Sequence, residues 1–285
     1  MTCNHPRPPL PPEQRRFKFV PVFTTLFVHI AACIAFLPGF ISWQSILVMF
    51  VALWLTIVGV TVGYHRLLAH RSFSAPLYVE RVLVALGTLA CQGGPLSWVT
   101  IHRQHHHYSD QVDDPHDAGR SFWWAHTEWF LHVIPALQNQ SRYTPDLQYD
   151  PFLQWLNRYF LLPQILIGAA FYFLADYYSI NGGGIGMLLW LFAVRLTITY
   201  NITKLVNSAG HGWGYRNFDT PDLSTNCWWL AYLSFGEGWH NNHHAFPGSA
   251  KFGTSVSEVD LGWQHIKLLA ALGLVNNIQL NPKRI

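Results

Sequence analysis

The sequence predicts an all-α integral membrane protein with four transmembrane helices in two hairpins and a cytosolic helical cap. Hydrophobic residues make up 50% of the chain and charged residues only 12%, about half of the roughly 25% usual in soluble domains. Four apolar stretches approach or exceed the length of about 20 helical residues that crosses a hydrocarbon core. The 15% aromatic content excludes a disordered chain.

The first two expected spans form a hairpin. They cover about 19–38 and 41–63, with a Pro-Gly turn between them and no charge in the second. Residues 1–18 are proline-rich and are expected to be a solvated cytosolic tail. The apolar run after them is of spanning length and leads into another span, which is not the pattern of a cleaved signal peptide. Residues 19–285 are expected to form a single domain.

The second hairpin is expected from about 159–175 and 185–206. Its second span contains Arg195 and ends near Lys204, and its loop, 176–184, is rich in glycine. Neither hairpin loop contains a lysine or arginine. By the positive-inside rule, both termini and the large polar segments are therefore expected in the cytoplasm.

Two further segments are expected at the membrane surface. The apolar stretch 82–101 is interrupted by Gln-Gly-Gly-Pro and lies between two histidine clusters that must share a compartment, so it is expected to dip into the interface rather than cross. Apolar positions within about 259–270 predict an amphipathic helix lying on the bilayer.

Histidine is unusually frequent, with 16 copies against 18 lysines and arginines together. Most fall in clusters at 65–70, 102–106 and 240–244, with a fourth element at 207–211. Imidazoles bind iron, copper, zinc and nickel, and this many exceed the coordination sphere of one ion. The cap is therefore expected to hold a di-metal site. The candidate ligands are His65, His70, His102, His105, His106, His211, His240, His243 and His244.

Helical spacing refines these clusters. In the pattern HxxHH, residues three and four apart share a face, whereas His107 points about 140° away from His102. His65 and His70 have the same five-residue offset. They are therefore expected to bind different ions, or the helix must break between them.

The type of metal follows from the ligand set. Zinc sites usually have four ligands and structural ones favour cysteine, so a large all-histidine set indicates redox-active iron. Acidic groups that could orient ligand rings lie nearby, with Asp114 and Glu237 the first candidates and Asp110, Asp113 and Asp117 beside them. Trp98 lies four residues before His102 and shares its helix face. It is expected either to form the wall of a substrate channel or to be an interfacial tryptophan.

The motifs HRLLAH, HRQHH, NSAGH and GEGWHNNHH resemble those of membrane fatty-acyl desaturases, especially the Δ9 class. The resemblance runs from Gly59 to about Leu280 and includes GVTVGYHR, DDPHD, FWWAH and FPGSA. It implies a four-span fold with a cytosolic cap, a non-haem centre of two Fe²⁺ ions, and introduction of a cis double bond with O₂ and two electrons. The nine histidines would be the iron ligands. Asn207, which shares a face with His211, matches an asparagine that reaches metal through water.

One departure concerns the substrate. Animal acyl-CoA desaturases have Arg-Asp before the second cluster, where this chain has Thr100-Ile101. An acyl chain in a membrane lipid is favoured over acyl-CoA, and a bacterial inner membrane or cyanobacterial membrane is the expected location. No His-Pro-Gly-Gly haem motif occurs, so electrons are expected from a separate donor of ferredoxin or cytochrome b5 type. No nucleic-acid partner is expected.

Two alternatives remain. Membrane di-iron hydroxylases and alkane monooxygenases use similar histidine-rich centres but yield a hydroxylated chain, which product analysis distinguishes. A metal transporter would place its histidines within the spans, whereas these clusters lie outside them.

Overall fold

The computed structural model describes residues 7–9 and 16–281, which form helices and loops with only isolated β-bridges between them. The all-helical expectation is confirmed. The elements named below are α1 (Phe19–Ala35), α2 (Trp43–Val58), η2 (Gly59–Ala69), α3 (Leu77–Thr88), α4 (Pro95–Tyr108), α5 (Trp129–Leu131), α7 (Pro151–Arg158), α8 (Leu162–Tyr177), α9 (Gly183–Leu188), η5 (Leu189–Val194), α10 (Arg195–Ser208), η6 (Ala209–His211), α11 (Trp228–Leu233), α12 (His240–Ala245) and α13 (Leu261–Ala271).

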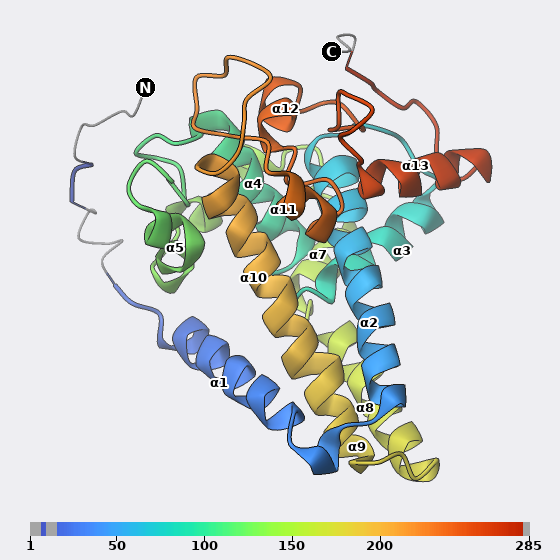
Figure 1. Cartoon of the computed structure of the whole chain (residues 1–285). Helices are drawn as coiled ribbons and strands as arrows, with labels where there is room; N and C mark the ends of the chain where they lie inside the picture. Colours follow the sequence, from blue (N-terminus) through green and yellow to red (C-terminus); the bar gives the residue numbers. More distant parts are fainter. Residues whose placement is uncertain (1–6, 10–15, 282–285) are drawn as a thin grey trace.

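Two long apolar helices form the centre of the molecule. The first is α2 continued without a break by the π-helix η2, 27 residues in all. The second joins α9, η5, α10 and η6 over 29 residues. Figure 1 shows α2 and α10 at the centre, with α4, α11, α12 and α13 gathered at one end and α9 at the other. Both are long and apolar enough to cross a membrane.

The other two expected spans are less regular. Residues 19–38 were expected to cross, but α1 ends at Ala35 and has 17 residues, fewer than the about 20 that a crossing takes. Helices α7 and α8 meet at a bend of 62° and are apolar enough to count together as one broken span. By length and composition the described residues therefore contain two candidate spans, or three with the bent pair.

Close packing against α3 fixes the position of η2. A Cβ atom on Gly59 would lie 2.3 Å from the backbone nitrogen of Gly87, and one on Gly63 would lie 2.6 Å from the carbonyl oxygen of Leu83. Glycine at both positions lets the two backbones approach. This contact holds the helix that carries the first histidine cluster.

The two segments expected at the membrane surface are helical. The stretch 82–101 is divided between α3 and α4. The C-terminal helix α13 begins at an N-cap, Asp260, whose side chain accepts from the Trp263 N–H at 2.9 Å.

The N-terminal tail was expected to be solvated, yet Arg7 Nε lies 2.8 Å from Asp117 Oδ2. An opposite charge on the loop after α4 is the physical reason. The rest of the expected tail falls largely outside the described residues.

Candidate metal centre

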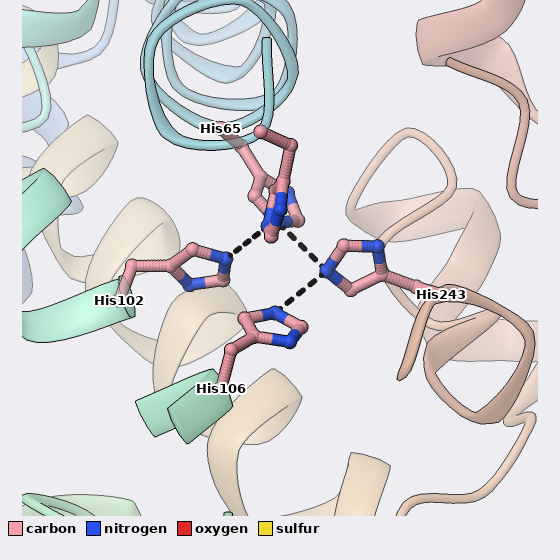
Figure 2. Close-up of side chains that lie close together, drawn as sticks. His65, His102, His106 and His243 are labelled. Carbon is pink, nitrogen blue, oxygen red and sulfur yellow. Dashed lines mark hydrogen bonds between the residues drawn. The ribbon is translucent and has the colours of Figure 1, made fainter. Parts of the chain in front are cut away.

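The nine clustered histidines come together in two groups at one end of the long helices. The first group contains His65, His70, His102, His106 and His243, and the second contains His105, His211, His240 and His244. Within each group the candidate ligand nitrogens all lie within 4.8 Å of one another. Figure 2 shows the labelled members of the first group pointing toward one another from η2, α4 and α12.

Ring nitrogens in the first group have the spacing that a shared ion requires. The Nε2 atoms of His65 and His243 are 3.0 Å apart, and those of His106 and His243 are 2.9 Å apart. The Nε2 atoms of His70 and His102 are 2.7 Å apart. Two nitrogen ligands at right angles, each about 2.1 Å from an ion, lie about 3 Å apart. The donor set therefore fits a metal ion.

His65 and His70 belong to the same candidate group, although α-helical geometry would turn them apart. The expectation that they bind different ions assumed that geometry, but the segment is a π-helix, in which residues five apart are hydrogen-bonded neighbours. The His70 N–H donates to the His65 carbonyl oxygen at 3.1 Å. No break in the helix is needed to bring the two rings together.

The second group has similar spacing. The Nε2 atom of His240 lies 3.0 Å from that of His211 and 3.1 Å from that of His244. The Nε2 atom of His105 lies 3.2 Å from that of His244. Helices α4 and α12 each contribute to both groups, since His102 and His243 belong to the first. The two groups are therefore held in a fixed relation by two short helices.

His107 behaves differently from its neighbours. It is exposed, and it belongs to neither group. This position agrees with the helical phase of α4, on which His102, His105 and His106 face the centre.

Carboxylates orient four of the rings through Nδ1, which leaves Nε2 free for a metal. His65 Nδ1 lies 2.5 Å from Glu237 Oε2, and His105 Nδ1 lies 2.8 Å from Asp114 Oδ2. The side chains of Asp114 and Glu237 thus lie where the sequence predicted a ring-orienting role.

Two more carboxylates contact ligand rings, Asp110, which was among the acidic residues named near the second cluster, and Asp222, which sequence reasoning missed. His211 Nδ1 lies 2.8 Å from Asp110 Oδ2, and His244 Nδ1 lies 2.8 Å from Asp222 Oδ2. Asp110 follows the second cluster closely, which was a weak signal. Asp222 lies 22 positions from its partner, in a loop with no recognisable pattern.

Burial sets the protonation of these rings. Desolvation, with the positive charge of neighbouring imidazoles, lowers the pKa of His102, His105, His106, His240 and His243 well below the usual value. These rings are neutral at neutral pH and keep a lone pair for a metal. Burial alone would raise the pKa of Asp222, but its hydrogen bond to His244 and that residue's charge lower it well below the usual range.

A cavity extends from the histidines between α2 and α10. Its apolar lining includes Ile57, Val60, Ile202 and Val206. This wall suits a hydrocarbon chain and brings it beside the two histidine groups.

Trp98 and Asn207 also line this cavity. The Trp98 indole stacks on the His102 ring, with centroids 5.0 Å apart. Asn207 is half-buried near the end of α10, and the cavity wall around it includes His105 and His240 of the second group.

His116 was not foreseen. It is buried, its ring centroid lies 4.1 Å from that of His105, and it forms a third possible ligand set with His105 and Asp114. Its place in the DDPHD motif was the signal available in the sequence.

Comparison with known proteins identifies the family. An sn-1 stearoyl-lipid 9-desaturase of Anabaena variabilis is 46% identical over 264 residues, covering 91% of this chain and 94% of the relative. An sn-1 stearoyl-lipid 9-desaturase of Synechocystis sp. is 43% identical over 95% of this chain and 85% of the relative. An sn-2 palmitoyl-lipid 9-desaturase of Nostoc sp. is 40% identical over 86% of this chain and 85% of the relative. The fatty acid desaturase family model matches residues 41–267, and the chain therefore belongs to the fatty acid desaturase family.

Proposed function

We propose that this protein is an O₂-dependent Δ9 desaturase that introduces a cis double bond into a saturated acyl chain of a membrane lipid. The observation that carries the proposal is the apolar cavity between α2 and α10, which ends against both histidine groups. A methylene chain offers no acidic proton and no leaving group, so acid–base or nucleophilic catalysis cannot act on it. Family membership and the named relatives support the same activity.

The two groups would hold two iron ions, with the nine histidines as ligands. Bound iron would supply the redox chemistry that takes two hydrogens from the chain with O₂ and two electrons. Glu237, Asp114, Asp110 and Asp222 hold the ligand rings in place through Nδ1. Asn207 would hold a water molecule beside the second group. The apolar cavity wall excludes bulk water and positions one methylene pair.

The substrate is proposed to be an acyl-lipid because the position before the second cluster has no charge for a CoA phosphate. Thr100 is fully buried there and Ile101 is half-buried. The relatives that act on stearoyl-lipid or palmitoyl-lipid support this choice. Electrons would come from a separate protein of ferredoxin or cytochrome b5 type.

The proposed topology has four crossings, with α1 and the bent pair α7 and α8 completing two hairpins around the long helices. The absence of lysine and arginine from both hairpin loops supports a cytoplasmic cap and cytoplasmic termini. The short α1 would cross with local thinning of the bilayer. The membrane would be a bacterial inner membrane or a cyanobacterial membrane, and residues 19–285 would act as one domain.

Expression in a host that lacks unsaturated fatty acids tests this proposal. Gas chromatography with mass spectrometry of derivatised lipids is expected to detect a Δ9 alkene in the cells that express the protein. Metal analysis of active protein is expected to approach two irons per chain. A hydroxylated chain as the main product would instead assign a hydroxylase, and active enzyme with zinc as its only metal would refute the iron assignment.

A further inference from the structure

Arg195 is buried in the middle of the second long helix. Its side chain is 1% exposed and its guanidinium donates three hydrogen bonds to neutral oxygens. Nε donates to the Leu191 carbonyl on the preceding turn at 2.7 Å. Nη1 donates to Thr56 Oγ1 on α2 and to the Leu89 carbonyl just after α3, both at 2.7 Å. One side chain therefore joins three separate elements.

The hydrogen-bond acceptors of this charge among the described residues are all neutral oxygens, and its Nη2 atom has no hydrogen-bond partner there. A buried unpaired charge is costly, and charged residues inside membrane helices usually have a functional role. The carbonyl of Leu89 also lies at the negative end of the α3 dipole, which favours a cation there. Arg195 thus fixes the C-terminal end of α3 against α2 and α10.

The contacts of Arg195 lie directly behind one end of the apolar cavity. Ile57, which follows Thr56, lines the cavity, and so does Thr199, whose hydroxyl donates to the Arg195 carbonyl at 2.9 Å. This end lies away from the histidines, because Thr199 precedes His211 by twelve residues, about 18 Å of helix axis. A chain held with one methylene pair at the histidines would direct its methyl end here.

We propose that Arg195 is a positioning residue that fixes the end of the cavity away from the histidines and thereby sets the acyl-chain length the enzyme accepts. The inference rests on the proposed desaturase function. The bonds to Thr56 and Leu89 keep α2 and the end of α3 close to α10, so a chain longer than the cavity meets a rigid wall. Weakening these bonds lets the wall yield to a longer chain.

The test compares turnover of stearoyl-lipid and arachidoyl-lipid in purified, iron-loaded variants. Arg195→Gln removes the charge, and Thr56→Val removes one bond while the charge stays. Both are expected to raise the ratio of kcat/KM for arachidoyl-lipid over stearoyl-lipid, by roughly tenfold for Arg195→Gln and less for Thr56→Val, with bound iron unchanged. Thr197→Val is the matched control, because its hydroxyl on the same helix has no hydrogen-bond partner.

Equal loss of turnover on both lipids, with the ratio unchanged in Thr56→Val, would overturn the inference. Because Thr56→Val keeps the charge, it decides the question even where Arg195→Gln does not fold. A wild-type enzyme that hydroxylates both lipids would refute the proposed function separately, since the chain-length ratio would still be measurable.

Discussion

The backbone N–H of His70 donates to the carbonyl oxygen of His65 at 3.1 Å, one π-helical turn apart. This bond brings two residues of one cluster into the same ligand group. Close packing of α3 against Gly59 and Gly63 fixes the position of this segment. In an α-helix, the five-residue offset would turn His70 away from His65. π-Bulges are frequent at functional sites.

We expect His65→Ala and His70→Ala to lose the same iron ion. Each should retain about one iron per chain in place of two, because each variant removes a ligand of the first group and leaves the second group intact. Metal analysis with Mössbauer spectroscopy measures both the amount and the type of iron left. His107→Ala is the control and should keep both ions, since His107 is exposed and belongs to neither group. Loss of different ions in the two variants would contradict the shared site.

The ring-orienting role of Asp222 leads to a second prediction. Asp222→Asn should lower iron affinity of the second group or turnover by about 10- to 100-fold, because His244 would lose the charged carboxylate that fixes its ring. Iron titration followed by turnover assays measures the loss. Asp219→Asn, an exposed neighbour three residues earlier, should behave as wild type. Equal affinities for the two variants would exclude an orienting role for Asp222.

Much of this site was predictable from sequence because the ligand residues are clustered. The phase of α4 correctly separated His107 from its neighbours, and the motifs identified the family. The grouping of His65 with His70 was not evident from their spacing, because that spacing was interpreted with α-helical rotation and the segment is a π-helix. Asp222 was missed because its contact with His244 is made by the fold of a loop, which no local pattern encodes. The helix α1 was predicted, but its end was placed three residues too late, because hydropathy continues past the point where the backbone turns.

Packing at the glycines gives a stability prediction. Gly59→Ala would place a Cβ atom 2.3 Å from the Gly87 backbone nitrogen, which should cost about 1–3 kcal/mol as an overpacked contact. Iron in the first group should fall as well, because η2 carries His65. Thermal unfolding in detergent and metal analysis report the two effects. Gly39→Ala is the matched control, since a Cβ there meets nothing within 4 Å. Equal stability of the two variants would refute the close-packing argument.

Acid should destabilise the metal-free protein. Burial lowers the pKa of His240 and His243 well below the usual value, so unfolding lets these rings take up protons once the pH falls below about 6.5. The unfolded state then binds more protons, and the free energy of unfolding decreases as the pH falls, by up to about 1.4 kcal/mol per pH unit for each ring. Chelator-treated protein should show a decreasing Tm between neutral pH and pH of about 5. His243→Ala should flatten this dependence and the exposed His107→Ala should not. A Tm independent of pH would contradict the neutral, buried state of these rings.

The last prediction concerns Asn207. Its half-buried amide lines the cavity near the C-terminal end of α10, four residues before His211. A neutral amide adds no charge to the second group and can hold a water molecule there, leaving a position that another ligand can replace. We therefore expect Asn207→Ala to retain most of its iron and lose most of its turnover, whereas His211→Ala should lose iron as well. If Asn207 only capped the end of α10, its removal would lower the free energy of unfolding by about 1 kcal/mol. Turnover per bound iron, measured in the same preparation, would then be nearly normal, and that result would remove Asn207 from the reaction.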